Sequence, residues 1–444
     1  MKYGARALVS ALVGGVAAGS AAAQSSGPVA VYWVSAATTT GMQGMGSMGS
    51  FGPGGARGMA PGGGPGMATG QRQGPPPQAQ PPRRPGLGSM LGAVGGGLGG
   101  LGGFGPFGRP PPQAQEDSEG ASYRGGPPPG MGGYGGGGDQ VSRSLELQLG
   151  SSQSPAGAPQ AAHFVPAGLR AGDSLPLVTP QVRSPEPAEP GGPPQMGQRP
   201  KGRMLIYWGC GEHAQGPITI DFARISASSP PSIPFIAANP GRPPSAGRYA
   251  TYGQWPNERS TVAIPAGGSL VGDHTIKGDY SPDIHFALAP GQDFLGPLNI
   301  TSREPTPAGG TRVSWGAVPG ATGYYAWMIG AQEQGETVVM WGSGSAANMM
   351  GSLTDYLPPG EVRRLVAQGA VMSPETTTCV VPSEVIKASP FGMLSMIAYG
   401  QESDFADPPR PVRPGTPWNL KWTVKVRRKS TTSALLGMPG GRGL

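Results

Sequence analysis

Short apolar runs recur along the second half of the chain, separated by glycine, proline, asparagine and aspartate. Runs of this length, rich in β-branched and aromatic residues, predict β-strands. They lie at 204–208, 218–225, 261–264, 284–288, 311–315, 324–329, 337–341, 393–399 and 418–426. One stretch differs, because Pro358 and Pro359 precede apolar residues at helical spacing, which predicts a single helix. The second half is therefore expected to be mostly β, built as one or more β-sandwiches.

Two further strand-like stretches stand alone in the first half of the chain. Residues 29–34 read Val-Ala-Val-Tyr-Trp-Val, and in 141–149 the apolar residues alternate with polar ones. Aromatic side chains are seldom left in water beside a polar, glycine-rich segment. Both stretches are therefore expected to add strands to the distant core, with the sequence between them looped out.

Glycine and proline set the expected organisation of the chain. The 444 residues include 80 glycines and 54 prolines, and this excess is concentrated between residues 41 and 140. Such a segment buries too little apolar surface to offset its backbone entropy, which predicts disorder. The expected parts after residue 23 are a β-prone segment (24–40), a disordered Gly/Pro/Met-rich tract (41–140), a linker with one strand (141–200), a β-domain of unassigned fold (201–295), a second β-domain (296–433) and a flexible tail (434–444).

The first residues have the pattern of a cleavable signal peptide. Lys2 and Arg6 precede a short uncharged run, and three alanines precede Gln24. The mature chain is expected to start at Gln24 and to contain no transmembrane segment, because the uncharged run is too short and weakly apolar to span a bilayer. The protein is therefore expected in the periplasm, the outer envelope or the medium.

Cys210 and Cys379 are the two cysteines of the chain. An oxidising compartment permits a disulfide between them. Two buried free thiols are the alternative, and the sequence leaves both open.

One part of the second half resembles a fibronectin type III domain. Residues 312–315 read Arg-Val-Ser-Trp, and 318–324 read Val-Pro-Gly-Ala-Thr-Gly-Tyr. They look like the second and third strands of that family, in which a Trp on one strand packs near a Tyr reached across a Pro-Gly turn. The match is best over 298–344 and implies a β-sandwich over about 296–433, with a helical insertion. The resemblance implies a spacer or binding module and no catalytic residue.

The basic residues near the C-terminus are the candidate contact surface. The net charge of +7 is small for a chain of this length, and it gives no reason to expect nucleic acid as a partner. Lysine and arginine nevertheless cluster in the last predicted strand, at Lys421, Lys425, Arg427, Arg428 and Lys429. This face either protects an edge strand from aggregation or docks onto an anionic polysaccharide, a lipid headgroup or a protein of the envelope.

Candidates for enzymatic chemistry are sparse. The four histidines lack the spacing of a zinc motif, and no cofactor-binding motif is found, so no cofactor is expected. Asp283 and His285 share a strand face and could form an acid/base pair, although a solvated outer face explains them more simply. Cys210, followed by Glu212 and His213, could form an activated thiol, but a loop is the simpler interpretation.

Met42, Met45 and Met48 form the one motif with specific coordination chemistry. Thioether sulfurs at every third position resemble the Met-rich sequences of periplasmic copper-handling proteins, because soft sulfur prefers Cu(I). Methionine also recurs elsewhere in the same glycine-rich tract, so composition alone can produce this triplet.

The sequence thus predicts an exported, envelope-associated or secreted β-sandwich protein with an interaction or structural role. An exported hydrolase and a Cu(I)-handling protein are the alternatives, and an enzyme is less favoured than a binding protein.

Overall fold

The computed structural model describes residues 27–41, 141–181, 202–224, 237–332, 336–346, 351–413 and 416–437. The predicted signal peptide (1–23) and the predicted disordered tract after Gly41 lie outside these residues. Met42, Met45 and Met48 and residues 182–200 of the predicted linker also lie outside them. The described part is mostly β, as the sequence predicts.

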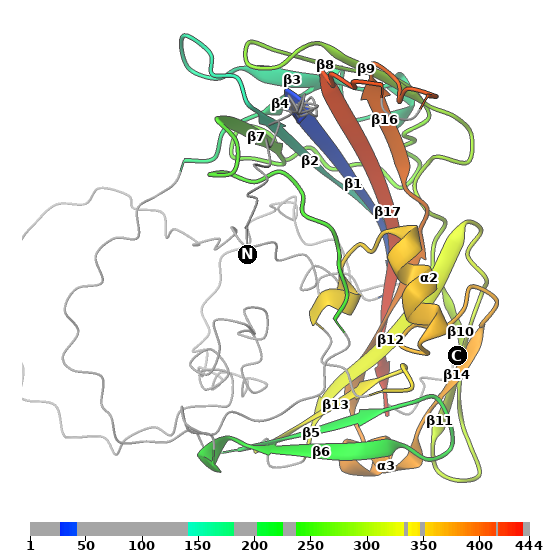
Figure 1. Ribbon diagram of the computed structural model, residues 1–444. Helices are drawn as coiled ribbons and strands as arrows, with labels where there is room; N and C mark the ends of the chain where they lie inside the picture. The colour runs from blue at the N-terminus through cyan, green and yellow to red at the C-terminus, as the bar shows by residue number, and fades with distance from the viewer. Residues whose placement is uncertain are drawn as a thin grey trace, which may run out of the picture.

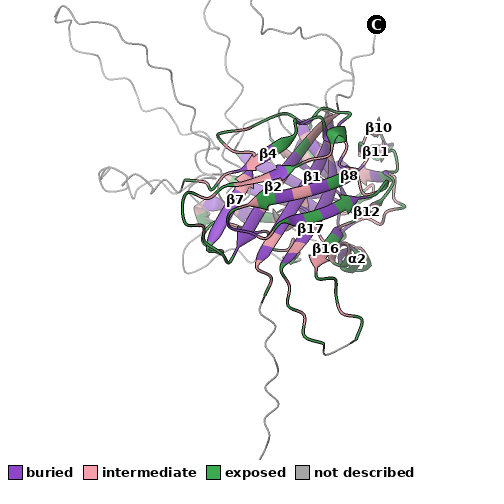
Figure 2. Cartoon of the chain, turned by 90° about the horizontal axis from the view of Figure 1, so that it is seen from above, coloured by how far each residue is buried: buried purple, intermediate pink, exposed green. Residues whose placement is uncertain are grey.

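A twisted sheet of ten strands is the central element of the fold (Figure 1). Nine strands follow one another across it in the order β6 (Gln215–Asp221), β5 (Arg203–Trp208), β13 (Thr337–Gly342), β12 (Ala321–Ala331), β15 (Gly392–Gly400), β17 (Trp422–Leu436), β1 (Ala30–Gly41), β2 (Ser142–Ser151) and β7 (Thr251–Trp255). The tenth, β16 (Ser403–Asp407), pairs with β17 beyond the end of β15. Buried residues follow these strands closely (Figure 2).

The N-terminal strand β1 lies near the middle of this sheet. It runs parallel to β17 over its whole length and antiparallel to β2. The prediction that the two isolated apolar stretches join the core is therefore confirmed. Thr39 of β1 pairs with Ser142 of β2, so the Gly/Pro-rich tract is inserted between two neighbouring strands. It is attached to the sheet at both ends, whereas a simple N-terminal tether would be attached at one.

Two smaller sheets cover one face of the large sheet. One has the order β4 (Ser174–Leu177), β3 (Ala161–Phe164), β8 (Gly272–Gly278) and β9 (Ile284–Leu288), and the other has the order β10 (Ile300–Pro305), β11 (Thr311–Trp315) and β14 (Thr378–Val381). The four-stranded sheet packs near one end of β17 and the three-stranded sheet toward the other (Figure 1).

These pairings change the expected division of the chain. β3 and β4 lie in the segment predicted as linker, and β5 and β6 join the same large sheet as β12, β13, β15, β16 and β17. The boundary predicted at residue 295 falls in the connection from β9 to β10, which crosses from one small sheet to the other. It does not divide the large sheet, because strands from both sides of the boundary take part in that sheet.

Helices are few in the described part of the chain. The predicted helix is present as α2 (Pro359–Ala367), and its Val362 and Leu365 pack against Tyr325 and Tyr399 on the second face of the large sheet. The remaining helical elements are α3 (Ser383–Ala388) and the short 3₁₀ turns η2 (Ala167–Leu169), η3 (Phe222–Arg224) and η4 (Gly351–Thr354).

Three strand predictions need correction. The strand predicted at 218–225 is β6, which ends at Asp221 and is followed by the turn η3. Residues 261–264 form no strand, and only an isolated bridge joins Ile264 to Arg143. The last predicted strand begins later than expected, at Trp422, and continues to Leu436. It includes the first residues of the predicted flexible tail, because β15 supplies pairing partners up to that point.

Candidate functional site

The basic residues near the C-terminus lie on or beside β17. The sequence pattern predicts that they form an exposed face of this strand. Arg427, Arg428 and Lys429 are instead buried, with exposed fractions of 5%, 5% and 4%. The physical reason is the position of β17, which has β15 and β16 on one side and β1 on the other. It is a central strand and not an edge, so the predicted solvated basic face is wrong for these three residues.

The two remaining lysines form ion pairs with carboxylates. Lys425 Nζ lies 2.7 Å from a Glu402 oxygen and 2.8 Å from an Asp404 oxygen. Lys421 is exposed and lies 3.4 Å from Asp407. Carboxylates of the protein itself therefore balance the positive charges of Lys421 and Lys425.

Aromatic rings cover Arg427 and Lys429 on one face of the sheet. The Arg427 guanidinium lies 5.0 Å from the centre of the Trp33 ring and 4.4 Å from that of Tyr356, and Lys429 Nζ lies 4.3 Å from the Tyr356 ring centre. Arg427 Nε also donates a hydrogen bond of 2.7 Å to Ser35 Oγ. Cation–π contacts gain strength when the cation is desolvated, so these contacts hold the segment around Tyr356 onto the sheet.

Two carboxylates lie near these cations, the half-buried Glu146 and the partly exposed Asp355. Burial raises the pKa of Glu146, although Lys429 and Arg427 act in the opposite direction. Burial likewise lowers the pKa of Lys429, against the opposing effect of Asp355 and Glu146. In both cases desolvation outweighs the attraction of the nearby opposite charges, as is common for charges removed from water.

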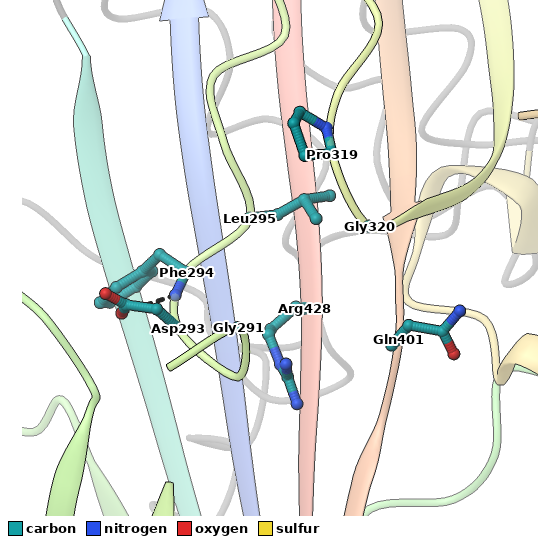
Figure 3. A pocket seen from close by; sticks show the side chains of 8 residues that line it. All are labelled: Gly291, Asp293, Phe294, Leu295, Pro319, Gly320, Gln401 and Arg428. Carbon is teal, nitrogen blue, oxygen red and sulfur yellow. Dashed lines mark hydrogen bonds between the residues drawn. The ribbon is translucent and has the colours of Figure 1, made fainter. Parts of the chain in front are cut away.

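Arg428 points to the other face of β17, where it lines a cavity of about 150 Å³ (Figure 3). Its walls come from the connection between β9 and β10, the turn before β12, the residue after β15, and β17. The lining residues are Gly291, Asp293, Phe294, Leu295, Pro319, Gly320, Gln401 and Arg428.

Polar side chains of the large sheet hold the connection from β9 to β10 in place. Thr38 Oγ1 donates a hydrogen bond of 2.6 Å to the carbonyl of Leu295, and Thr40 Oγ1 donates to the carbonyl of Leu298. The Leu298 N–H donates to Ser430 Oγ at 3.0 Å. These buried hydroxyls of β1 and β17 satisfy a backbone segment that has no sheet partner of its own.

Arg428 itself has an incomplete set of partners. Its Nη2 donates to Ser403 Oγ, and its buried Nε finds no hydrogen-bond partner within the described part of the chain. Burial lowers the pKa of this guanidinium, with Asp293 and Glu402 opposing. Asp293 is satisfied elsewhere, since its oxygens accept from Ser269 Oγ and from the backbone N–H groups of Leu270 and Phe294.

A buried chain of hydrogen bonds, missed in the sequence, joins the large sheet to the four-stranded sheet. Tyr32 Oη lies 2.8 Å from His163 Nδ1, and His163 Nε2 lies 2.9 Å from His274 Nδ1. His274 Nε2 in turn donates to the Leu270 carbonyl at 2.7 Å. No sequence signal links these residues, because His163 lies in the segment predicted as linker and 111 positions from His274.

The acid/base pair considered in the sequence lies on the solvated outer face. Asp283 and His285 are exposed, while Ile284 and Phe286 between and after them are buried. The simpler interpretation of these residues is thus correct. His285 Nδ1 lies 3.1 Å from Thr275 Oγ1.

Cys210 and Cys379 are joined by a disulfide that closes a sequence separation of 169 residues. It ties the loop after β5 to β14, and so links the large sheet to the three-stranded sheet. A bonded sulfur is no thiol nucleophile, and His213 Nδ1 is instead 2.9 Å from a Glu384 oxygen.

The described residues show neither a metal site nor a membrane-spanning helix. These residues hold no cluster of three or more His, Cys, Asp or Glu side chains suited to a metal ion. Nor does any helix among them have the length and apolar character needed to cross a membrane.

Comparisons with protein-family models, with curated proteins and with solved structures found no match to this chain. Its function must therefore be argued from the sites described above.

Proposed function

We propose that this chain is an exported protein with an interaction or structural role. Its three sheets, linked by the disulfide and called the body below, present the Gly/Pro/Met-rich tract to the cell envelope or its surroundings. The pairing of Thr39 with Ser142 carries the proposal. The tract follows β1 and precedes β2, which are adjacent strands of the large sheet. The pairing of these strands therefore holds the two ends of the tract close together. A large, glycine-rich insertion mounted in this way suits contact with a partner better than catalysis in a preformed cleft.

Export is supported by two independent features. The first residues have the charge and apolar pattern of a signal peptide. The disulfide between Cys210 and Cys379 fits an oxidising compartment such as the periplasm or the medium, since bonds of this kind are rare in the cytosol.

The fibronectin type III resemblance supports an interaction role. Trp315 and Tyr324 pack edge to face, with ring centres 5.7 Å apart, and the Val318 N–H donates to the Tyr324 hydroxyl at 2.8 Å. Strands β10, β11 and β14 oppose β5, β13, β12, β15 and β17 of the large sheet across one apolar core. Many β-sandwich domains bind other proteins or act as spacers.

Cu(I) handling is the second candidate, supported by the preference of thioether sulfur for Cu(I) at Met42, Met45 and Met48. Met42 follows directly on Gly41, the last residue of β1. The methionine triplet therefore starts where the tract leaves the sheet. A peptide of residues 38–52 should bind Cu(I) if this candidate holds, and a peptide with the three methionines replaced by leucine is its control.

Cell fractionation of two chains tests the main proposal. One chain is the full protein, and in the other residues 43–139 are replaced by a short Asn-Gly turn that closes the hairpin of β1 and β2. Both should be exported, processed and disulfide-bonded, but only the full chain should sediment with the envelope or a bound partner.

A third chain, with the residues of the tract in shuffled order, separates sequence from composition. Recovery of all three chains as free periplasmic monomers would contradict the interaction role. Retention of the full chain in the cytoplasm with residues 1–23 intact would contradict export.

A further inference from the structure

Lys429 and Asp355 are placed to react with each other, and we propose that they form an intramolecular amide bond between the lysine side-chain nitrogen and the aspartate carboxyl carbon. The bond joins the central strand β17 to the segment that leads into α2. This modification goes beyond the proposed presentation of the tract, because it lies in the body and needs no residue of the tract.

The fold holds the two groups together at a place that excludes most water from the lysine. Lys429 Nζ lies 3.9 Å from Asp355 Oδ1, and the lysine side chain is 5% exposed. Its Nζ also lies 4.3 Å from the ring centre of Tyr356, the residue after Asp355. The Asp355 side chain is about half exposed, so its carboxyl group can rotate toward the nitrogen. Groups held this close react without the entropic cost of meeting, which removes much of the barrier.

The amine must be neutral to attack a carboxyl carbon, and burial favours the neutral form of Lys429. Desolvation lowers the pKa of Lys429, and the attraction of nearby carboxylates does not offset it. Lys425 of the same strand gives the contrast. Burial acts in the same direction there, but hydrogen bonds to two carboxylates outweigh it and raise the pKa of Lys425. Lys425 therefore stays an ammonium ion, and Lys429 reaches the nucleophilic form at lower cost.

The backbone beside Asp355 polarises its carboxyl group. Asp355 Oδ1 accepts a hydrogen bond of 2.7 Å from the Tyr356 N–H. Attack of an amine on a carboxyl carbon places negative charge on an oxygen of that group, and a backbone N–H already aimed at the oxygen stabilises this charge. The same contact fixes Oδ1, which leaves Oδ2 as the oxygen that departs.

The step balances without any other reactant. The lone pair of Lys429 Nζ forms the bond to Asp355 Cγ, the bond from Cγ to Oδ2 breaks, and Oδ2 leaves as water with two protons from the lysine ammonium group. Glu146 acts electrostatically on Lys429 and is itself acted on by Asp355, so it lies near both. Burial raises the pKa of Glu146, which suits it to take a proton from the amine and pass it to the departing oxygen. The product is a neutral amide, which removes the cost of keeping an ammonium ion away from water.

Mass spectrometry of the mature chain, after reduction of its disulfide, tests the proposal. The unaltered chain should be lighter than its sequence requires by one molecule of water, and trypsin should leave the peptide that contains Lys429 joined to the peptide that contains Asp355. Lys429→Met and Asp355→Ala should each abolish this loss of water. Lys425→Met removes a lysine of the same strand whose carboxylate contacts are shorter, at 2.7 and 2.8 Å, and this matched control should retain the loss.

Three results would overturn the bond. They are an unaltered chain with the full mass of its sequence, a loss of water that persists in the Asp355→Ala chain, and a joined peptide in which Lys429 is linked to a residue other than Asp355. The first and third measurements use the unaltered chain, so the proposal stays testable if Lys429→Met does not fold. Fractionation of the chain with the tract replaced is a separate measurement, so failure of either proposal leaves the other standing.

Discussion

At the scale of single residues, the hydrogen bonds of His163 and His274 define their tautomers. The Leu270 carbonyl can only accept, so His274 carries its proton on Nε2 and accepts at Nδ1. His163 must then donate from Nε2 and accept at Nδ1 from the Tyr32 hydroxyl. Every group in this hydrogen-bonded series is satisfied with both imidazoles neutral, and an added proton on His274 Nδ1 would face the Nε2–H of His163.

This arrangement predicts loss of stability in mild acid. Burial lowers the pKa of both histidines below the ordinary value of about 6.5. Between the folded-state and unfolded-state pKa values the unfolded chain binds more protons, so the free energy of unfolding is full above about pH 6.5 and falls as the pH drops below it. The slope should reach about 1.4 kcal/mol per pH unit for each histidine.

Urea denaturation between pH 5 and 7 measures this slope. His163→Gln should reduce it, because one buried imidazole is removed, whereas exposed His285→Gln should leave it unchanged. Equal slopes in the His163→Gln chain and the unaltered chain would contradict the assignment.

At the scale of elements, β1, β2 and β17 show how distant segments complete one another. β1 pairs with β17, nearly 400 residues away in sequence, and with β2 across the inserted tract. Without β1, both neighbours would lose a partner in the middle of the sheet. Closing a long loop is nevertheless inexpensive, because its entropy grows only with the logarithm of its length.

The same scaling predicts that shortening the insertion stabilises the body. Replacing residues 43–139 by a short turn reduces the loop between β1 and β2 from about a hundred residues to about five, which should raise the free energy of unfolding by about 2 to 3 kcal/mol. Guanidinium denaturation of the two chains measures the difference. A turn of twenty Gly/Ser residues should give an intermediate value, and a loss of stability on shortening would mean that the tract contributes contacts to the body.

At the scale of the whole molecule, the Cys210–Cys379 bond joins layers that are otherwise linked by packing and by hydrogen bonds such as that from the Gly211 N–H to the Val380 carbonyl. It connects the large sheet to the three-stranded sheet across 169 residues of sequence. A crosslink over so long a loop acts mainly by restricting the unfolded chain.

Removal of this bond should lower the free energy of unfolding by about 2 to 5 kcal/mol. Denaturation of the Cys210→Ser/Cys379→Ser chain measures the effect, and addition of a reductant to the unaltered chain should reproduce it. The double-serine chain itself should not respond to the reductant. An unaltered stability after complete reduction would show that packing alone fixes the two sheets.

Several features of this architecture could be predicted from the sequence. β-branched and aromatic runs located β5, β9, β11, β12, β13 and β15, and two prolines before a helical stripe located α2. The apolar runs near residues 31 and 145 indicated strands of the core because little else could cover their side chains. Such signals are local, since each depends on residues within one strand or one helical turn.

The tertiary structure decided which faces are buried and which residues meet. Alternation placed Val424 and Val426 of β17 on one face, but it could not show that the other face is also covered, since that depends on Trp33 and Tyr356 from distant segments. The sequence pattern therefore predicts that Arg427 and Lys429 are exposed, whereas both are buried in the fold. The cavity beside Arg428 and the histidine chain likewise arise from segments more than a hundred residues apart, whose pairing no local pattern records.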